Sequence, residues 1–225
     1  MKLLKAISLG AIAFTLATGF GLGGNALKSS KKVKKGPVEI SVPYAKYTKY
    51  FGYVDQNVKP EGKYKNKDAY YLYVWVPAAA DEIGLSMISP AKGKAGKKDF
   101  KHSNFKAGMK SDKKAYFDTY LVLDRMAVVD PGKIKSAKKV LDTLAKNDDS
   151  SELPKNPGGS KYNSLLRHKS QLGNPTKAIV RGLYRITFTS FRGDVKGSYL
   201  ATVGTNVPGL KIADSLEELH KIVNK

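Results

Sequence analysis

Four aspartates are the side chains whose types and spacing could do chemistry in this sequence. Asp148 and Asp149 are adjacent in the segment KNDDSSE, although Lys and Arg outnumber Asp and Glu by 40 to 19 across the chain. Asp118 and Asp124 lie in YFDTYLVLDRM, a segment whose apolar residues alternate as they do in a β-strand. Carboxylates grouped in this way suit two chemistries, general acid and base catalysis or the binding of a hard cation such as Ca²⁺.

Asp118 needs a partner more than the other three, because the strand that carries it is otherwise mostly apolar. A period of two places Phe117, Leu121 and Leu123 on one face of the strand, and Asp118 and Tyr120 on the other. A charge in this position is costly unless it is compensated. A lysine or a capping interaction is one candidate partner. A Ca²⁺ ion is the other, since it takes about 6 to 8 oxygen ligands and tolerates irregular loops.

Catalytic motifs are missing or lie in the wrong context. A GxGxxG match at 19–24 falls in an apolar N-terminal run with no strand before it. An SxxK match at 136–139 lacks the partner motifs of a penicillin-binding site. The chain has no cysteine, and His102, His168 and His220 are far apart without a zinc-binding spacing. Nothing local marks any aspartate as protonated, so we expect a protein that is not an enzyme.

The charge of the chain indicates which partners it attracts. The net charge is +21 at pH 7, and the basic residues are 35 Lys and 5 Arg. Such a field attracts polyanions. Sequence-specific reading of nucleic acid is not expected, because bidentate contacts to bases and phosphates favour Arg over Lys. The lysine clusters lie in segments rich in Gly, Pro, Ser and Asn, where solubility alone is an alternative explanation.

The N-terminus predicts export. Lys2 and Lys5 precede an apolar run and the small residues Gly24 to Ala26, so residues 1–26 are predicted to be a signal peptide. Residues 27–37, LKSSKKVKKGP, are predicted to be a flexible basic leader. Residues 38–225 are long enough for a single domain with its own core. Without cysteine, that domain has neither disulfides nor a lipid attached through a cysteine.

Strands dominate the predicted elements. Segments rich in β-branched and aromatic residues predict strands at 38–44, 69–76, 115–129, 178–191 and 197–204. The last two are separated by a short turn, which predicts a hairpin. The fold class is therefore mainly β, an antiparallel β-sandwich with a few peripheral helices.

Three helical segments are expected beside the sheets. After Pro131, apolar residues at helical spacing up to Leu144 predict a helix that leads the chain to Asp148. Residues 77–84 begin with Pro and end with Gly, which predicts a short helical turn. Ser215 and Glu218 form a capping box for a terminal helix.

Four blocks of the sequence resemble the major surface lipoprotein family of leptospires, the LipL-thirty-two family. They occur in the same order as in that family and span most of residues 65–204. The blocks are KNKDAYYLYVWVPAAADEIGLSMISP (65–90), YFDTYLVLDRM (116–126), KYNSLLR (161–167) and VRGLYRITFTSFRGDVKGSYLATVG (180–204). The resemblance implies a jelly-roll-like β-sandwich, in agreement with the strands predicted from the residues.

The resemblance also implies a Ca²⁺ site. The family binds this ion through an aspartate and a threonine on one strand, two aspartates of an acidic loop and a tyrosine before an Asn-Ser pair. These positions correspond here to Asp118 and Thr119, to Asp148 and Asp149, and to Tyr162. Three carboxylates with further oxygen atoms form a chemically reasonable calcium shell.

The resemblance implies an exported surface binding protein, with departures from the family pattern. The lipobox cysteine and the longer aspartate run of the family are missing here, so we expect a non-lipidated homologue. It would lie in the periplasm, at the cell surface or outside the cell, associated with the outer membrane without a lipid anchor. The ligands implied are an extracellular matrix protein or an anionic polysaccharide, and a homodimer is left open. The alternative is an envelope structural protein whose lysine-rich surface binds lipopolysaccharide or DNA.

Overall fold

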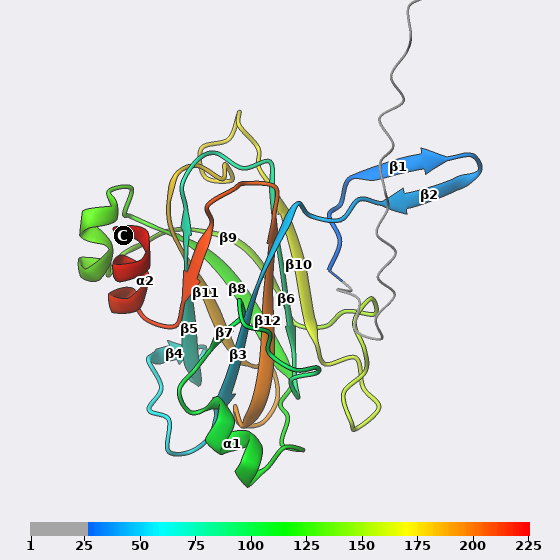
Figure 1. Ribbon diagram of the computed structural model, residues 1–225, viewed down its shortest axis with the longest axis vertical. Helices are drawn as coiled ribbons and strands as arrows, with labels where there is room; N and C mark the ends of the chain where they lie inside the picture. Colours follow the sequence, from blue (N-terminus) through cyan, green and yellow to red (C-terminus); the bar gives the residue numbers. More distant parts are fainter. Residues whose placement is uncertain (1–26) are drawn as a thin grey trace, which may run out of the picture.

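The computed structural model describes residues 27–225, so the signal peptide expected over residues 1–26 lies outside the described residues. Two sheets pack face to face in this part of the chain, with short helices at the periphery (Figure 1). The prediction of a mainly β protein built as an antiparallel β-sandwich is confirmed.

Each sheet is assembled from strands that are distant in sequence. The first sheet has the order β10 (Ser164–Lys169), β6 (Glu82–Ile88), β12 (Gly197–Thr205), β3 (Lys46–Val54) and β7 (Phe100–Lys101). The second has the order β13 (Lys211–Ala213), β5 (Lys67–Val76), β11 (Gly182–Ser190), β8 (Thr119–Met126) and β9 (Val140–Asn147), with β4 (Gly62–Tyr64) paired to β5. Neighbouring strands are antiparallel except β3 and β7, which are parallel.

The core forms between the two sheets from side chains that alternate along each strand. Leu121 and Leu123 of β8 and Phe188 of β11 meet Leu85 and Met87 of β6 there, and all five are buried. Burying one such side chain contributes about 1.5 to 3 kcal/mol. The period of two predicted for residues 116–126 is therefore confirmed. Phe117, Leu121 and Leu123 point into the core between the sheets, and Asp118 lies on the opposite face.

The N-terminal part of the domain differs from the expectation. Residues 27–37, predicted as a flexible leader, include a buried Leu27 and the strand β1 (Lys32–Lys35), which pairs with β2 (Val38–Ser41). This hairpin projects away from the sandwich (Figure 1). Ser30 joins residues 27–31 to the first sheet, because its N–H donates to the buried carboxylate of Glu82 at 2.9 Å. The strand expected over 38–44 is shorter and lies outside the two main sheets.

Three expectations about local elements are wrong. The predicted helix after Pro131 is only a 3₁₀ turn, η1 (Pro131–Ser136), and the chain then enters β9. Its helical spacing was coincidental, because Ile134 packs under α2 (Leu216–Val223) whereas Leu141 is exposed and lies on the edge strand. Residues 77–84 are not helical, because Ile83 alternates with Leu85 in a buried strand. The hairpin expected between 178–191 and 197–204 does not form, since β11 and β12 belong to different sheets.

The terminal helix is confirmed. The hydroxyl of Ser215 accepts a hydrogen bond from the N–H of Glu218 at 3.2 Å, as a capping residue does. Leu219 is buried against the second sheet, beside Trp75. The remaining helix, α1 (Phe105–Ser111), packs on β3 through Gly108, where a Cβ would overlap the ring of Tyr53.

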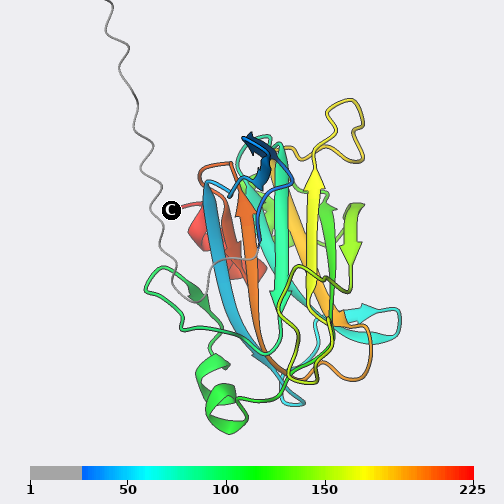
Figure 2. The same ribbon diagram turned by 90° about the vertical axis from the view of Figure 1, so that its right-hand side faces the viewer.

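The connecting segments that position the candidate site lie at one end of the sandwich. Figure 2 shows the long loop that joins β9 to β10 at the same end as the β4–β5 turn and the β11–β12 connection. These three segments, 148–163, 65–66 and 191–196, are brought together only by the folding of both sheets.

Candidate functional site

Asp118 is a buried carboxylate that has no hydrogen-bond partner in the described part of the chain. It immediately precedes β8, is 7% exposed, and neither of its side-chain oxygens is bonded to any of the described residues. Asp124, six residues later on the same face, is also buried, but it accepts from Arg185 at 2.9 Å and from Thr143 at 2.7 Å. No lysine or capping group within residues 27–225 forms a hydrogen bond or an ion pair with Asp118.

The two loop aspartates act electrostatically on Asp118. Burial, with a further contribution from the negative charges of Asp149 and Asp148, raises the pKa of Asp118 to about 6. The cations of Arg192 and Lys67 act in the opposite direction. The pKa of Asp149 is raised as well, through burial and the charge of Asp148. The negative charges of Asp148 and Asp149 therefore act on Asp118, and a divalent cation bound beside these carboxylates would compensate them.

The pairing of β8 with β9 accounts for this proximity. The ladder ends with the pair Leu121 and Asn147. An antiparallel strand that continues past Asn147 runs alongside the beginning of β8, so Asp148 and Asp149 reach the level of Thr119. The N–H of Asp149 donates to the side chain of Asp148 at 2.8 Å, which turns the chain at this point.

Ser164 joins two of the predicted positions directly and a third through Thr119. Its Oγ lies 2.6 Å from the carbonyl oxygens of both Thr119 and Asp148, and its N–H donates to the Thr119 hydroxyl at 2.8 Å. The N–H of Thr119 in turn donates to the carbonyl of Tyr162 at 3.1 Å. The main chain at Thr119, Asp148 and Tyr162 is thus held together, while the Thr119 hydroxyl is occupied within the core.

A recess opens beside Asp118. It has an empty volume of about 830 Å³, including the part open to solvent. The residues that line it are Tyr116, Phe117, Asp118, Asn156, Gly158, Ser160, Tyr162, Arg192, Gly193 and Asp194. Arg192 donates to the Tyr162 hydroxyl at 3.4 Å, and its guanidinium lies 5.8 Å from the centre of the Tyr162 ring. Arg192 is therefore the cation that lowers the pKa of Asp118 most. It forms no ion pair with Asp118 among the described residues.

The donor atoms of this region fit a hard cation in type. They are carboxylate, carbonyl and hydroxyl oxygens, which Ca²⁺ prefers. The side-chain oxygen of Asn147 is also buried and unbonded within the described chain. However, no three acidic, histidine or cysteine side chains in residues 27–225 converge as a ready-made metal-binding group. Closure around an ion would need Asp148 and Asp149 to move toward Asp118.

Two residues of this region, Ser164 and Arg192, were not predicted as site residues from the sequence. Ser164 follows Tyr162 in the motif KYNSL, so that motif could have identified it. Arg192 carried no local signal, because only the crossing from β11 to β12 brings it near Asp118. Of the predicted site residues, the structure brings Asp148 and Asp149 close enough for their charges to act on Asp118. Hydrogen bonds join the main chain of Thr119 to that of Tyr162 and, through Ser164, to that of Asp148.

Comparison with known proteins identifies the family. Residues 38–212 match Lipl32, a family described as a surface lipoprotein of the order Spirochaetales. No curated protein matches the chain. No helix in the described residues is long and apolar enough to cross a membrane. Because the match extends from β2 into β13 and includes every residue of the candidate site, the chain belongs to the Lipl32 family of spirochaetal surface lipoproteins.

Proposed function

We propose that the protein is a Ca²⁺-binding protein of the cell envelope that acts as a binding module rather than as an enzyme. The observation that carries the proposal is Asp118, whose buried carboxylate has no hydrogen-bond partner among the described residues and faces the field of Asp148 and Asp149. A buried carboxylate in this state costs stability unless a cation meets it.

The residues that would hold the ion are the carboxylates of Asp118, Asp148 and Asp149, with oxygen atoms from Thr119 and Tyr162. Ca²⁺ accepts such a mixed set and tolerates the irregular loop that follows β9. When bound, the ion would compensate the negative charges and tie the 148–163 loop to the beginning of β8. Its role in this proposal is to stabilise the loop end of the sandwich.

The setting of the protein is also a proposal. The sequence contains no cysteine, so we propose that this member of a lipoprotein family is exported without a cysteine-linked lipid. It would be periplasmic, at the cell surface or secreted, and associated peripherally with the outer membrane. The ligand class that suits its basic exterior best is an anionic polysaccharide, with an extracellular matrix protein as the other family-derived candidate.

Calorimetric titration of Ca²⁺ into chelator-treated protein tests the proposal, with the melting temperature followed in parallel. We expect saturable binding and a rise in melting temperature, both lost in the variant Asp148→Asn/Asp149→Asn. The matched control is Glu217→Gln/Glu218→Gln, which removes the same charge from α2, where each glutamate pairs with a lysine at the surface. Absence of heat and of a thermal shift at millimolar Ca²⁺ would refute the calcium site.

A second candidate function is polyanion binding through the lysine-rich loops. The observation that favours it is the net charge of +21. Lipopolysaccharide and DNA are the polyanions that an exported protein of this charge would meet. The two candidates differ in their dependence on salt, because binding through many lysines releases counterions.

A further inference from the structure

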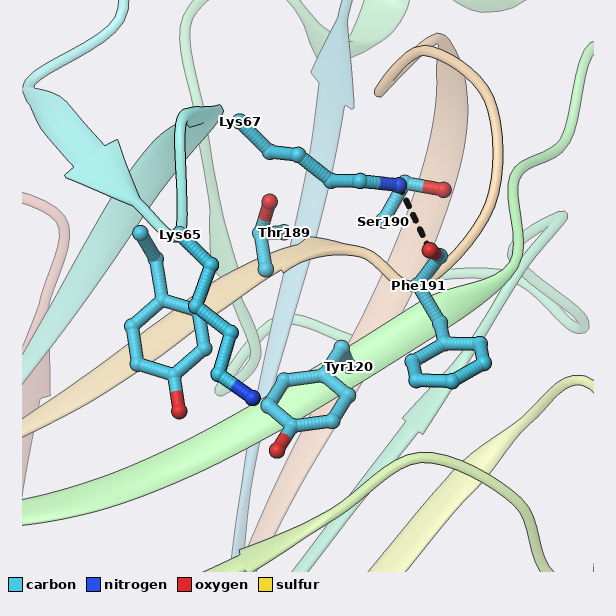
Figure 3. A pocket seen from close by; sticks show the side chains of 7 residues that line it. Lys65, Lys67, Tyr120, Thr189, Ser190 and Phe191 are labelled. Carbon is cyan, nitrogen blue, oxygen red and sulfur yellow. Dashed lines mark hydrogen bonds between the residues drawn. The ribbon is translucent and has the colours of Figure 1, made fainter.

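An aromatic recess lies next to the candidate calcium site, where β4, β5, β8 and β11 meet (Figure 3). Its empty volume is about 330 Å³, including the part open to solvent. The lining residues are Tyr64, Lys65, Lys67, Tyr120, Thr189, Ser190 and Phe191. It shares none of its residues with the recess beside Asp118, so it is a separate place on the surface.

Three aromatic rings form one wall of this recess. The ring of Tyr120 lies at the centre, 5.5 Å from that of Tyr64 and 6.0 Å from that of Phe191. The planes of Tyr120 and Phe191 are tilted by only 16°, and Phe191 is 46% exposed. Tyr120 is only 9% exposed, so Phe191 is the ring that the recess presents most fully to solvent. An exposed aromatic ring in a recess accepts the apolar C–H face of a sugar ring.

Two lysines supply the charge of the recess. The β4–β5 turn holds Lys65 and Asn66 in the left-handed region, with φ of 48° and 65°, and Figure 3 shows the Lys65 side chain reaching across the recess toward Tyr120. The ammonium of Lys67 donates to the carbonyl of Phe191. Neither Lys65 nor Lys67 forms an ion pair with a carboxylate in the part of the chain that the structure describes. The recess therefore suits an anion and repels a cationic ligand.

We propose that this recess is a subsite for one acidic sugar unit of a polysaccharide. The sugar's C–H face would lie on the exposed ring of Phe191, beside Tyr120, and its carboxylate or sulfate would meet Lys65 and Lys67. The hydroxyls of Tyr64 and Tyr120 would hydrogen-bond the polar edge of the ring. An acidic peptide side chain carries the charge but lacks the flat apolar face. The inference rests on the proposed binding function, and it assigns the anionic polysaccharide to this recess.

The calcium site and the recess are linked through β8. Tyr120 follows Asp118 by two residues and lies on the same face of the strand, and the chain that continues β9 past the pair Leu121 and Asn147 runs beside Tyr120 at Asp148. The carboxylates of Asp118, Asp148 and Asp149 are therefore close enough to repel an anionic ligand in the recess. Ca²⁺ bound to these carboxylates would remove the repulsion, so the acidic sugar should bind more tightly with Ca²⁺ present.

The test uses a hyaluronan hexasaccharide, which carries a uronate on alternate units, titrated into the full protein in the presence of Ca²⁺. Chitohexaose is the neutral comparator. We expect saturable binding of the acidic sugar alone, weakened at least about tenfold by Phe191→Ala and by Lys65→Gln. The controls are Leu172→Ala, a more exposed apolar residue in another loop, and Lys94→Gln, an exposed lysine, both with wild-type affinity. Melting temperatures establish that each variant is folded.

The outcomes separate this inference from the proposed function. Saturable Ca²⁺ binding without hexasaccharide binding, or equal binding by wild type and both recess variants, overturns the subsite and leaves the calcium site standing. Hexasaccharide binding that the recess variants abolish, in a protein that takes up no Ca²⁺, supports the subsite and refutes the calcium site. Equal affinity for chitohexaose overturns the requirement for an acidic sugar.

Discussion

Asp118 and Asp124 share one face of one strand but differ in what the fold places beside them. Asp124 meets Arg185 and Thr143, so its negative charge is compensated. Asp118 meets the field of Asp148 and Asp149 instead. Two similar carboxylates therefore have different energetic roles, and only Asp118 has an energetic reason to bind a cation.

Substituting Asp118→Asn should have opposite effects with and without Ca²⁺. In chelator at pH 7.5, the variant should be more stable than wild type by about 1 to 2 kcal/mol, because it removes a buried charge, with allowance for solvent screening. In Ca²⁺, wild type should gain about 2.7 kcal/mol at roughly 100 times the Kd, and the variant should gain little. Urea denaturation of both proteins under both conditions measures this. A variant that is less stable than wild type in chelator would contradict the assignment.

The pH dependence of stability follows from the raised pKa of Asp118, about 6. The unfolded chain has the ordinary value of about 3.9, so between these two values the folded state binds more protons than the unfolded state. Stability in chelator should therefore be highest below pH 4 as far as this group is concerned, and should fall as the pH rises through about 6. The difference in unfolding free energy between wild type and Asp118→Asn, measured from pH 4.5 to 7.5, isolates this group. A difference that is flat with pH would contradict the raised pKa.

At the scale of elements, a pair of glycines shapes the outer face of the first sheet. Gly84 of β6 and Gly204 of β12 are directly paired, and the ring of Tyr44 lies over both. The hydroxyl of Tyr44 donates to the buried Glu82, which also accepts from Ser30. The absence of two side chains therefore lets an aromatic ring lie flat on the sheet and attach residues 27–44 to the sandwich.

Gly204→Ala should destabilise the protein by displacing Tyr44. A Cβ at this position would overlap the Tyr44 ring, and overpacking of a tightly packed site costs about 1 to 3 kcal/mol. Gly173→Ala is the matched control, because a Cβ there meets nothing within 4 Å among the described residues. Chemical denaturation of both variants measures the difference. Equal stability of the two would show that Tyr44 does not depend on the glycine pair.

For the molecule as a whole, charge and shape favour different ligands. The net charge of +21 acts over the entire surface and does not distinguish one polyanion from another. The aromatic recess offers two lysines and a specific wall of rings. A ligand bound by the general field and a ligand bound in the recess should therefore respond differently to salt.

Salt dependence separates these two modes of binding. Double-stranded DNA held by many lysines should lose about a thousandfold or more in affinity between roughly 50 and 200 mM salt, because each contact releases counterions. The hyaluronan hexasaccharide, held by two lysines and aromatic contacts, should lose far less over the same range. Phe191→Ala should weaken only the hexasaccharide. DNA binding that is insensitive to salt would argue against the lysine-rich surface as its site.

Several features of the fold were predictable because they depend on neighbours in the sequence. The alternation along residues 116–126 identified a strand and its buried face, and Ser215 with Glu218 identified the capped terminal helix. The strand β9 was not predicted, because the apolar residues from Ile134 to Leu144 also fit a helical spacing. Residues 140–147 form a strand because they pair with the edge of β8. The β11–β12 hairpin was wrongly expected, because a six-residue connection can turn within one sheet or cross to the other.

The sequence by itself determined the mainly β class, the polyanion-attracting charge and the aspartates available for a cation. Only the tertiary structure decided that Asp118 has no hydrogen-bond partner within residues 27–225, since the arginine that compensates Asp124 is 61 residues away in the chain. The junction at Ser164 and Thr119 likewise joins residues 45 apart. The physical reason is that periodicity and composition act over a few residues, whereas the cost of a buried charge depends on every group that folding brings within a few ångströms of it.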